Sequence, residues 1–141
     1  MDDRIKRLME QRVGEEGYAL RAGMRLVDMA PGSAVVEMTP GPEDLNIFGM
    51  VHGGAIFSLA DEAFQISCNS YGTIAVALSV NIIYHRPAER GVRLRAESRQ
   101  ISSSRRTATY DIKIYDLKPD PIASCQALAY RKGEPLPFLE G

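Results

Sequence analysis

The sequence predicts an α+β domain in which one antiparallel sheet of about five to six strands wraps around one long helix. Three features predict this class: a single helical stretch of about 16 residues that starts at Gly53 or Gly54, two candidate strands before it, and four candidate strands in succession after it. We expect the domain to span residues 18–132, between a helix in residues 1–17 and a loose tail in residues 133–141.

The residues before the long helix predict a short helix and a pair of strands. Apolar side chains recur at helical spacing between residues 2 and 13, and Gly14 and Gly17 are expected to end that helix. Strands are predicted for residues 24–29 and 34–39, because Ala30-Pro31-Gly32-Ser33 between them is a turn signal.

The residues after the long helix predict an antiparallel meander. Residues 76–84, 92–99, 107–114 and 122–131 alternate in the manner of strands and are separated by turns rich in Pro, Gly and Ser. The first of these strands carries no charge on either face. We therefore expect it at the centre of the sheet, covered on both sides.

Composition disfavours several classes of protein. Lys and Arg total 17 and Asp and Glu total 18, so a protein that binds nucleic acid through its phosphates is not expected. Two cysteines are too few for a disulfide framework, and the acidic opening residues have the wrong sign for a signal peptide, so a cytoplasmic protein is expected. Residues 63–84 are uncharged and long enough to cross a membrane. Polar side chains interrupt them, however, so we interpret them as a helix end, a turn and a buried strand.

The segment from Asn46 to Gly54, which leads into the long helix, is the most informative for function. A helix N-terminus presents unpaired amides and a partial positive charge, and Gly53 and Gly54 let a ligand approach the backbone closely. An oxygen that becomes negative during a reaction would be stabilised there. The alternative is a flexible loop in which His52 is only a polar cap of the helix.

Asp61 is a candidate general base. It lies about two turns into the helix beside Phe57, where burial would raise the pKa of its carboxyl. Gln65 shares its face and could hold a water molecule. The alternative is a helix face on which Asp61, Glu62 and Gln65 are all in water.

These residues, taken together, resemble the signature of a known family. The run Asn46-x5-His52-Gly53-Gly54-x6-Asp61 is similar to the signature of hotdog-fold acyl-CoA thioesterases, specifically the phenylacetate-degradation (PaaI-like) branch. Further matching pieces are Ser58-Leu59-Ala60-Asp61, Asn81-Ile82-x-Tyr84, and the Arg86-Pro87-Ala88 turn with Gly91. The resemblance implies a hotdog fold, hydrolysis of acyl-CoA with no cofactor because coenzyme A is part of the substrate, and a homo-oligomer. Its dimers would join two sheets edge to edge and usually pair into tetramers.

The resemblance also implies roles residue by residue. The Gly53 amide would polarise the thioester carbonyl, and Asp61 of another protomer would act as general base on water or as nucleophile. Asn46 would position substrate or water, and His52 would orient the loop or contact the thioester. Gln65 stands where relatives often have a Thr that holds a water molecule.

The other candidate substrate-binding residues are carried over more loosely. Ser79 is the nearest candidate for a strand Ser that related enzymes use, with Ala77 as the alternative match to that position. Gly54 lies beside Gly53 at the helix start, and Phe57 could line an apolar pocket for the acyl group or instead belong to the core or an interface. The phosphates of CoA need cationic partners, for which Arg86, Arg105, Arg106 and Arg131 are candidates; the alternative is that these side chains are only solvated. The spacing of the two histidines and of the two cysteines fits no metal site.

Two other functions stay open on the sequence alone. A hotdog enoyl-CoA hydratase or dehydratase pairs a His with a helix acid, which His52 and Glu62 could imitate, although the D-x-N-P-x-H pattern of one such branch is missing. The second is a module that binds acyl-CoA without turnover.

Overall fold

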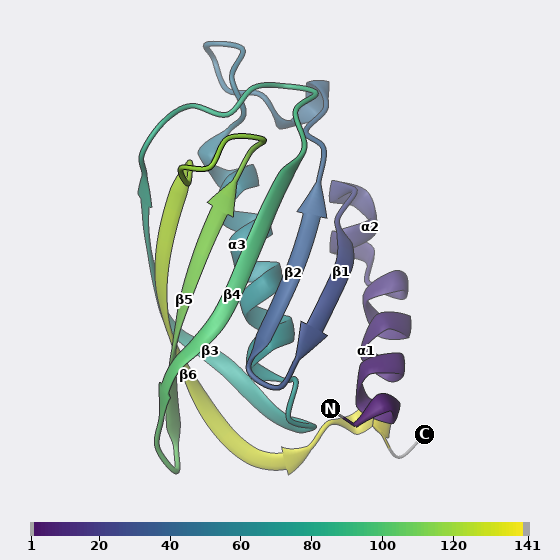
Figure 1. Cartoon of the computed structure of the whole chain (residues 1–141). Helices are drawn as coiled ribbons and strands as arrows, with labels where there is room; N and C mark the ends of the chain where they lie inside the picture. Colours follow the sequence, from purple (N-terminus) through teal and green to yellow (C-terminus); the bar gives the residue numbers. More distant parts are fainter. Residues whose placement is uncertain (1, 140–141) are drawn as a thin grey trace.

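A computed structural model describes residues 2–139 and has one curved sheet with the long helix along one of its faces (Figure 1). The helices are α1 (Asp3–Glu15), α2 (Gly17–Ala22) and α3 (Gly53–Cys68), with 3-10 turns at Pro42–Asp44 and Pro137–Leu139. The strands are β1 (Arg25–Ala30), β2 (Ser33–Met38), β3 (Thr73–Tyr84), β4 (Leu94–Ser103), β5 (Thr107–Tyr115) and β6 (Ala123–Pro135). The predicted fold class is confirmed.

The six strands are antiparallel in the order β1-β2-β4-β5-β6-β3. Only β4, β5 and β6 form a meander, and β3 pairs with β6 alone at one edge. The prediction that the strand at residues 76–84 lies at the centre of the sheet is therefore wrong for the single chain. Absence of charge on a strand does not require cover on both faces: exposed fractions of 57% for Leu78 and 66% for Ile83 leave this strand open.

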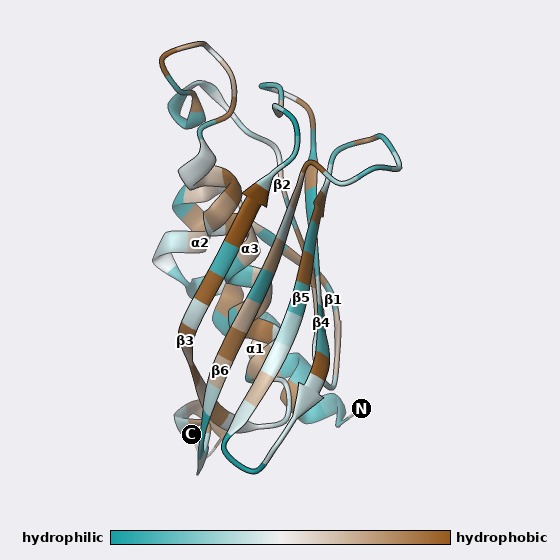
Figure 2. Cartoon of the chain, turned by 90° about the vertical axis from the view of Figure 1, so that its left-hand side faces the viewer, coloured by the Kyte–Doolittle hydropathy of each residue, from teal (hydrophilic) through white to brown (hydrophobic). Residues whose placement is uncertain are grey.

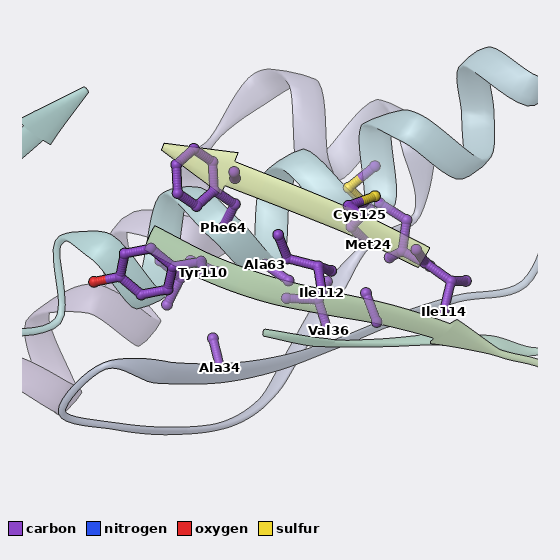
Figure 3. Packing of buried hydrophobic residues seen from close by; sticks show 14 of the residues in the cluster. Met24, Ala34, Val36, Ala63, Phe64, Tyr110, Ile112, Ile114 and Cys125 are labelled. Atoms are coloured by element: carbon purple, nitrogen blue, oxygen red, sulfur yellow. The ribbon is translucent and has the colours of Figure 1, made fainter. Parts of the chain in front are cut away.

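The apolar side predicted for the long helix packs against the sheet. Ile56, Leu59, Ala63 and Ile66 of α3 are at most 3% exposed. Figure 3 shows the centre of this core, with side chains from α3, from several strands and from Met24 just before β1: Met24, Ala34, Val36, Ala63, Phe64, Tyr110, Ile112, Ile114 and Cys125. The rings of Phe64 and Tyr110 meet edge to face with centroids 5.4 Å apart. This packing fixes the position of the helix N-terminus, where the candidate site begins.

The two ends of the chain are more regular than expected. Helix α1 continues through Gly14, and Gly17 opens the short helix α2, which the sequence did not predict. Strand β6 runs to Pro135 and the buried Leu136 donates its amide to the Gly72 carbonyl (3.0 Å). The chain from 133 to 139 thus differs from the loose tail that was expected, whose last two residues lie outside the described part.

The two edges of the sheet differ in charge. Strand β1 carries Arg25 and Asp28 and has a bulge between Leu26 and Asp28, features that discourage pairing with another strand. Strand β3 contains no charged residue, and Figure 2 shows brown, hydrophobic segments along it. The β3 edge is therefore the one that remains suited to pairing.

Candidate active site

Asn46 shapes the loop that leads into α3. Its Oδ1 accepts hydrogen bonds from the backbone amides of Phe48 (2.9 Å) and Met50 (3.1 Å), and its own amide donates to the Met50 carbonyl (2.7 Å). Gly49 supplies the left-handed backbone (φ 77°) that the turn requires. Because Oδ1 is engaged, Nδ2 is the atom of Asn46 that is left to contact a substrate.

His52 is the N-cap of α3. Its Nδ1 accepts a hydrogen bond from the Gly54 amide (2.8 Å), so the neutral ring carries its proton on Nε2. A Cβ atom at residue 54 would lie only 2.9 Å from this Nδ1, which explains the glycine there. The polar cap considered from the sequence is present, and it organises the turn around Gly53.

The backbone amide of Gly53 is left without an acceptor. The Gly54 amide is taken by the His52 ring, and the amides of Ala55 and Ile56 donate to the His52 carbonyl (2.9 and 3.3 Å). Within residues 2–139, no acceptor pairs with the Gly53 amide. Since the helix dipole adds partial positive charge at this end, this donor suits an oxygen that becomes negative.

A groove of about 590 Å³, here called the Gly53 groove, opens beside this amide. Its walls come from the Asn46 loop, the first turn of α3 and the end of β3 with the turn that follows. The lining residues are Asn46, Phe48, Met50, Val51, Gly53, Ile56, Tyr84, His85, Arg86, Pro87 and Ala88. Ile56 contributes to this lining, and the half-buried Phe57 of the candidate set does not.

Tyr84 belongs to the same junction, although no role is predicted for it from the sequence. Its hydroxyl donates to the Gly53 carbonyl (2.9 Å), and burial raises the pKa of the phenol, with Cys125 as a smaller cause. The only signal for Tyr84 was its place in the Asn81-Ile82-x-Tyr84 piece of the family resemblance.

Asp61 does not reach the Gly53 groove of its own chain. It lies about 12 Å farther along the helix axis, at roughly 1.5 Å per residue. Its side chain is half-buried, and burial, followed by the negative charge of Glu16, raises the pKa of its carboxyl. A raised pKa prepares Asp61 to act as a base, but the structure does not bring it together with the Gly53 amide.

Gln65 is engaged with two carboxyl groups. Its Nε2 donates to Glu16 Oε2 (3.3 Å) and to Glu62 Oε1 (3.4 Å). Glu62 is only 5% exposed, and burial and Glu16, with Asp61 adding less, raise its pKa to about 9. The interpretation that this helix face lies wholly in water is therefore excluded for Glu62. Glu62 also stands about 15 Å from His52 along the helix axis, so the pair considered for a hydratase does not form within one chain.

Ser79 lies on the sheet face away from α3. It is paired with Leu128, whose neighbours Ala127 and Ala129 are buried on the helix side. Adjacent strand residues point to opposite faces, and paired residues share a face. Ser79 accordingly lines a separate groove of about 290 Å³ and is not brought to the Gly53 groove.

Arg86 is occupied by an ion pair. Its two terminal nitrogens donate to the Asp116 carboxylate at 2.6 and 2.8 Å, and Nη2 also donates to the Asp120 carbonyl (2.6 Å). This contact lowers the pKa of Asp116 to about 2. Arg86 therefore ties the end of β3 to the β5–β6 turn, and its guanidinium is not free for a phosphate group.

Arg105 and Arg106 lie in the exposed turn between β4 and β5. Arg106 Nη1 donates to the hydroxyl of Tyr130 (3.0 Å). This turn is at the opposite end of the sheet from the Asn46 loop (Figure 1). Within one chain, these arginines and the Gly53 groove are separate.

The described residues also bear on metals and membranes. Among residues 2–139, no three His, Cys, Asp or Glu side chains are grouped so that they could hold a metal ion. Cys68 and Cys125 are buried free thiols. None of the helices in that range is both long and apolar enough to cross a membrane.

Three comparisons with known proteins agree. Residues 48–123 match the model of the Thioesterase superfamily. The chain is 39% identical over 113 residues to a putative esterase of Archaeoglobus fulgidus, covering 80% of this chain and 73% of that protein. It is 37% identical over 118 residues to the acyl-coenzyme A thioesterase PaaI of Escherichia coli, covering 84% of each. The solved structure of the E. coli PaaI protein, from the phenylacetic acid degradation operon, matches with a TM-score of 0.89 and 32% identity, covering 94% of this chain and 96% of that chain. The hotdog fold that the resemblance implied is confirmed.

Proposed function

The chain belongs to the thioesterase superfamily, and we propose that it hydrolyses acyl-CoA thioesters to free acid and CoA, with the Gly53 amide polarising the thioester carbonyl and Asp61 acting as general base on water or as nucleophile. The observation that carries the proposal is the free Gly53 amide at the N-terminus of α3, beside a groove, on the scaffold of an acyl-CoA thioesterase. The proposal needs no cofactor, because coenzyme A is part of the substrate.

The reaction adds water across the carbon–sulfur bond. As general base, Asp61 takes a proton from water while the water oxygen bonds to the acyl carbon; the carbon–sulfur bond then breaks and the CoA sulfur receives the proton. As nucleophile, an Asp61 oxygen bonds to the acyl carbon and releases CoA, and water then hydrolyses the mixed anhydride. In both routes the carbonyl oxygen becomes negative and accepts a hydrogen bond from Gly53.

A second copy of the chain would complete this site. An uncharged, exposed edge strand such as β3 is suited to pairing with an identical strand, and two such strands related by a two-fold axis run antiparallel. Antiparallel pairing reverses the partner, so its Asp61 and its β4–β5 turn would approach the Gly53 groove. Such dimers pairing again would give a tetramer.

The antiparallel arrangement of the two copies also suggests where CoA binds. Arg105 and Arg106 of the second copy would be brought toward the groove and would supply charge for the CoA phosphates. Asn46 Nδ2 would contact substrate or water, and His52 would act by holding the turn.

We place the enzyme in the cytoplasm, without nucleic-acid or membrane partners.

Release of free thiol from a panel of short, medium, long and aromatic acyl-CoAs tests the function. Asp61→Ala is expected to lower kcat by at least about 100-fold, because it removes the carboxylate that serves as general base or nucleophile. Glu10→Ala, which removes an exposed carboxyl from α1, is the control, and size-exclusion chromatography verifies that both variants keep the wild-type oligomer.

The outcomes separate the alternatives. Full activity of Asp61→Ala would contradict the mechanism. Conversion of an enoyl-CoA to its hydroxyacyl product without free thiol would indicate a hydratase. Saturable binding with no turnover across the panel would indicate a binding module.

A further inference from the structure

We propose that Tyr84 is a positioning residue for the reaction: its hydroxyl holds the Gly53 carbonyl and so steadies the backbone of Gly53, whose amide is the free donor beside the groove. The inference rests on the proposed function. It goes beyond that function because it assigns a role to a strand residue that neither donates to the substrate nor exchanges a proton with it.

Two side chains hold the peptide group between Gly53 and Gly54, directly after the α-carbon that carries the Gly53 amide. On one side, the His52 ring accepts from the Gly54 amide (2.8 Å); on the other, the Tyr84 hydroxyl donates to the Gly53 carbonyl (2.9 Å). The Tyr84 ring also packs so closely that a Cβ atom at residue 53 would stand 3.3 Å from its outer atoms. Glycine has no Cβ atom, so its backbone torsion angles vary easily, and these contacts restrict them.

Tyr84 is itself held firmly. The next residue, His85, donates its amide to the Ile122 carbonyl (2.8 Å), and Arg86 forms the two-pronged ion pair with Asp116. These contacts anchor the end of β3 to the β5–β6 region. The Tyr84 phenol therefore holds the N-terminus of α3 in a fixed position relative to the sheet.

The Tyr84 hydroxyl has one proton, and this proton is already used in the hydrogen bond to the Gly53 carbonyl. Tyr84 is thus not a second donor to the substrate oxygen. The raised pKa of the phenol agrees with a group that remains protonated and donating. Its effect on catalysis acts through the backbone, where a small misplacement of a donor is costly for rate.

Tyr84→Phe tests the proposal, because it deletes the hydroxyl and keeps the ring packed on Gly53. We expect kcat to fall about tenfold, with KM changed less than about twofold and the melting temperature nearly unchanged. Tyr71→Phe is the matched control: it removes a hydroxyl that donates to Gln100 (3.0 Å) at the other end of α3, and kcat should not change.

An infrared measurement separates positioning from loss of structure. The probe is a ketone analogue of the acyl-CoA, with a CH₂ group in place of sulfur, which binds without hydrolysis. In the wild-type enzyme the bound carbonyl band should lie at lower frequency than in water, because the Gly53 amide polarises it. In Tyr84→Phe this shift should be smaller, and in Tyr71→Phe it should be unchanged.

Each outcome decides the matter. A Tyr84→Phe enzyme with wild-type kcat, or one that is slower while its carbonyl band is unchanged, overturns this inference alone. A wild-type protein that releases no thiol from any acyl-CoA overturns the proposed function, and this inference with it.

Discussion

At the residue scale, the Gly53 amide is set apart by what its neighbours do. The His52 side chain and carbonyl accept from the next three amides of the helix, so only Gly53 retains a donor for a ligand. The His52 cap, which on the sequence alone is the alternative to a catalytic loop, therefore helps to leave the Gly53 amide as the free donor. It satisfies every amide of the first turn except that of Gly53, which lines the groove.

Gly53→Pro should remove this donor with little harm to the fold. Proline is accepted at the first position of a helix, and His52 already has the extended backbone (φ −64°, ψ 138°) that a residue before proline prefers. We expect kcat/KM to fall about 100- to 1,000-fold, the usual effect of losing one such donor, with an unchanged circular dichroism spectrum. Gly53→Ala is the control, since it keeps the amide and only presses on Tyr84. Equal activity of the two variants would show that the amide is not used.

Glu62 makes the stability of the folded protein depend on pH. Folding raises the pKa of its carboxyl from 4.5 to about 9, chiefly through burial and then through Glu16. The folded protein thus binds a proton that the unfolded chain releases above about pH 4.5. The stability from that proton is full below this pH and is lost as the pH rises toward 9.

Glu62→Gln should accordingly stabilise the protein at alkaline pH. The amide has nearly the shape of the protonated carboxyl and does not ionise. We expect the variant to gain melting temperature relative to the wild type between pH 5 and pH 9, reaching about 2–4 °C. Thermal denaturation followed by circular dichroism at several pH values measures this. Glu10→Gln, on the exposed face of α1, should show no such trend, and a pH-independent difference for Glu62→Gln would count against the buried proton.

At the scale of elements, the edge strand β3 is the feature on which the two-chain site depends. Leu78→Lys places a charge on this edge, where the wild-type side chain is 57% exposed. We expect the variant to be folded, to sediment as a smaller species and to lose most thioesterase activity. Val27→Lys is the matched control, because it places the same charge on the opposite edge strand, β1, where Val27 is 40% exposed. Activity retained by a monomeric Leu78→Lys protein would contradict a site made by two chains.

What the sequence could predict at this scale follows from the range of the interactions. The start of α3 and its buried side followed from local spacing, and the structure confirms both. The place of β3 did not follow, because alternation tells which face a side chain takes and not which strand becomes its neighbour. Glu62 is buried by the α1–α2 junction near Glu16, and the Tyr84–Gly53 bond joins positions 31 residues apart. Such long-range contacts leave no local pattern.

At the scale of the whole molecule, the separation of Gly53 and Asp61 along one rigid helix leads to a prediction about mixtures. If each site takes its amide from one chain and its carboxylate from another, Gly53→Pro and Asp61→Asn are defective in different halves of the site. In a mixed dimer, the Asp61→Asn chain supplies an intact Gly53 and the Gly53→Pro chain an intact Asp61. One of the two sites in that dimer is then complete.

Co-expression of the two inactive variants should therefore restore activity. Random pairing makes half of the dimers mixed, each with one working site of two, so about a quarter of the wild-type rate per chain is expected. The thiol-release assay on the co-purified protein measures this, and each variant expressed alone provides the baseline. A double variant carrying both changes, co-expressed with wild type, controls for pairing: its mixed dimers have no complete site, so the rate per chain should also be about a quarter. If both reacting groups instead came from the same chain, the two inactive variants together would stay at baseline, and the double variant with wild type would give about half.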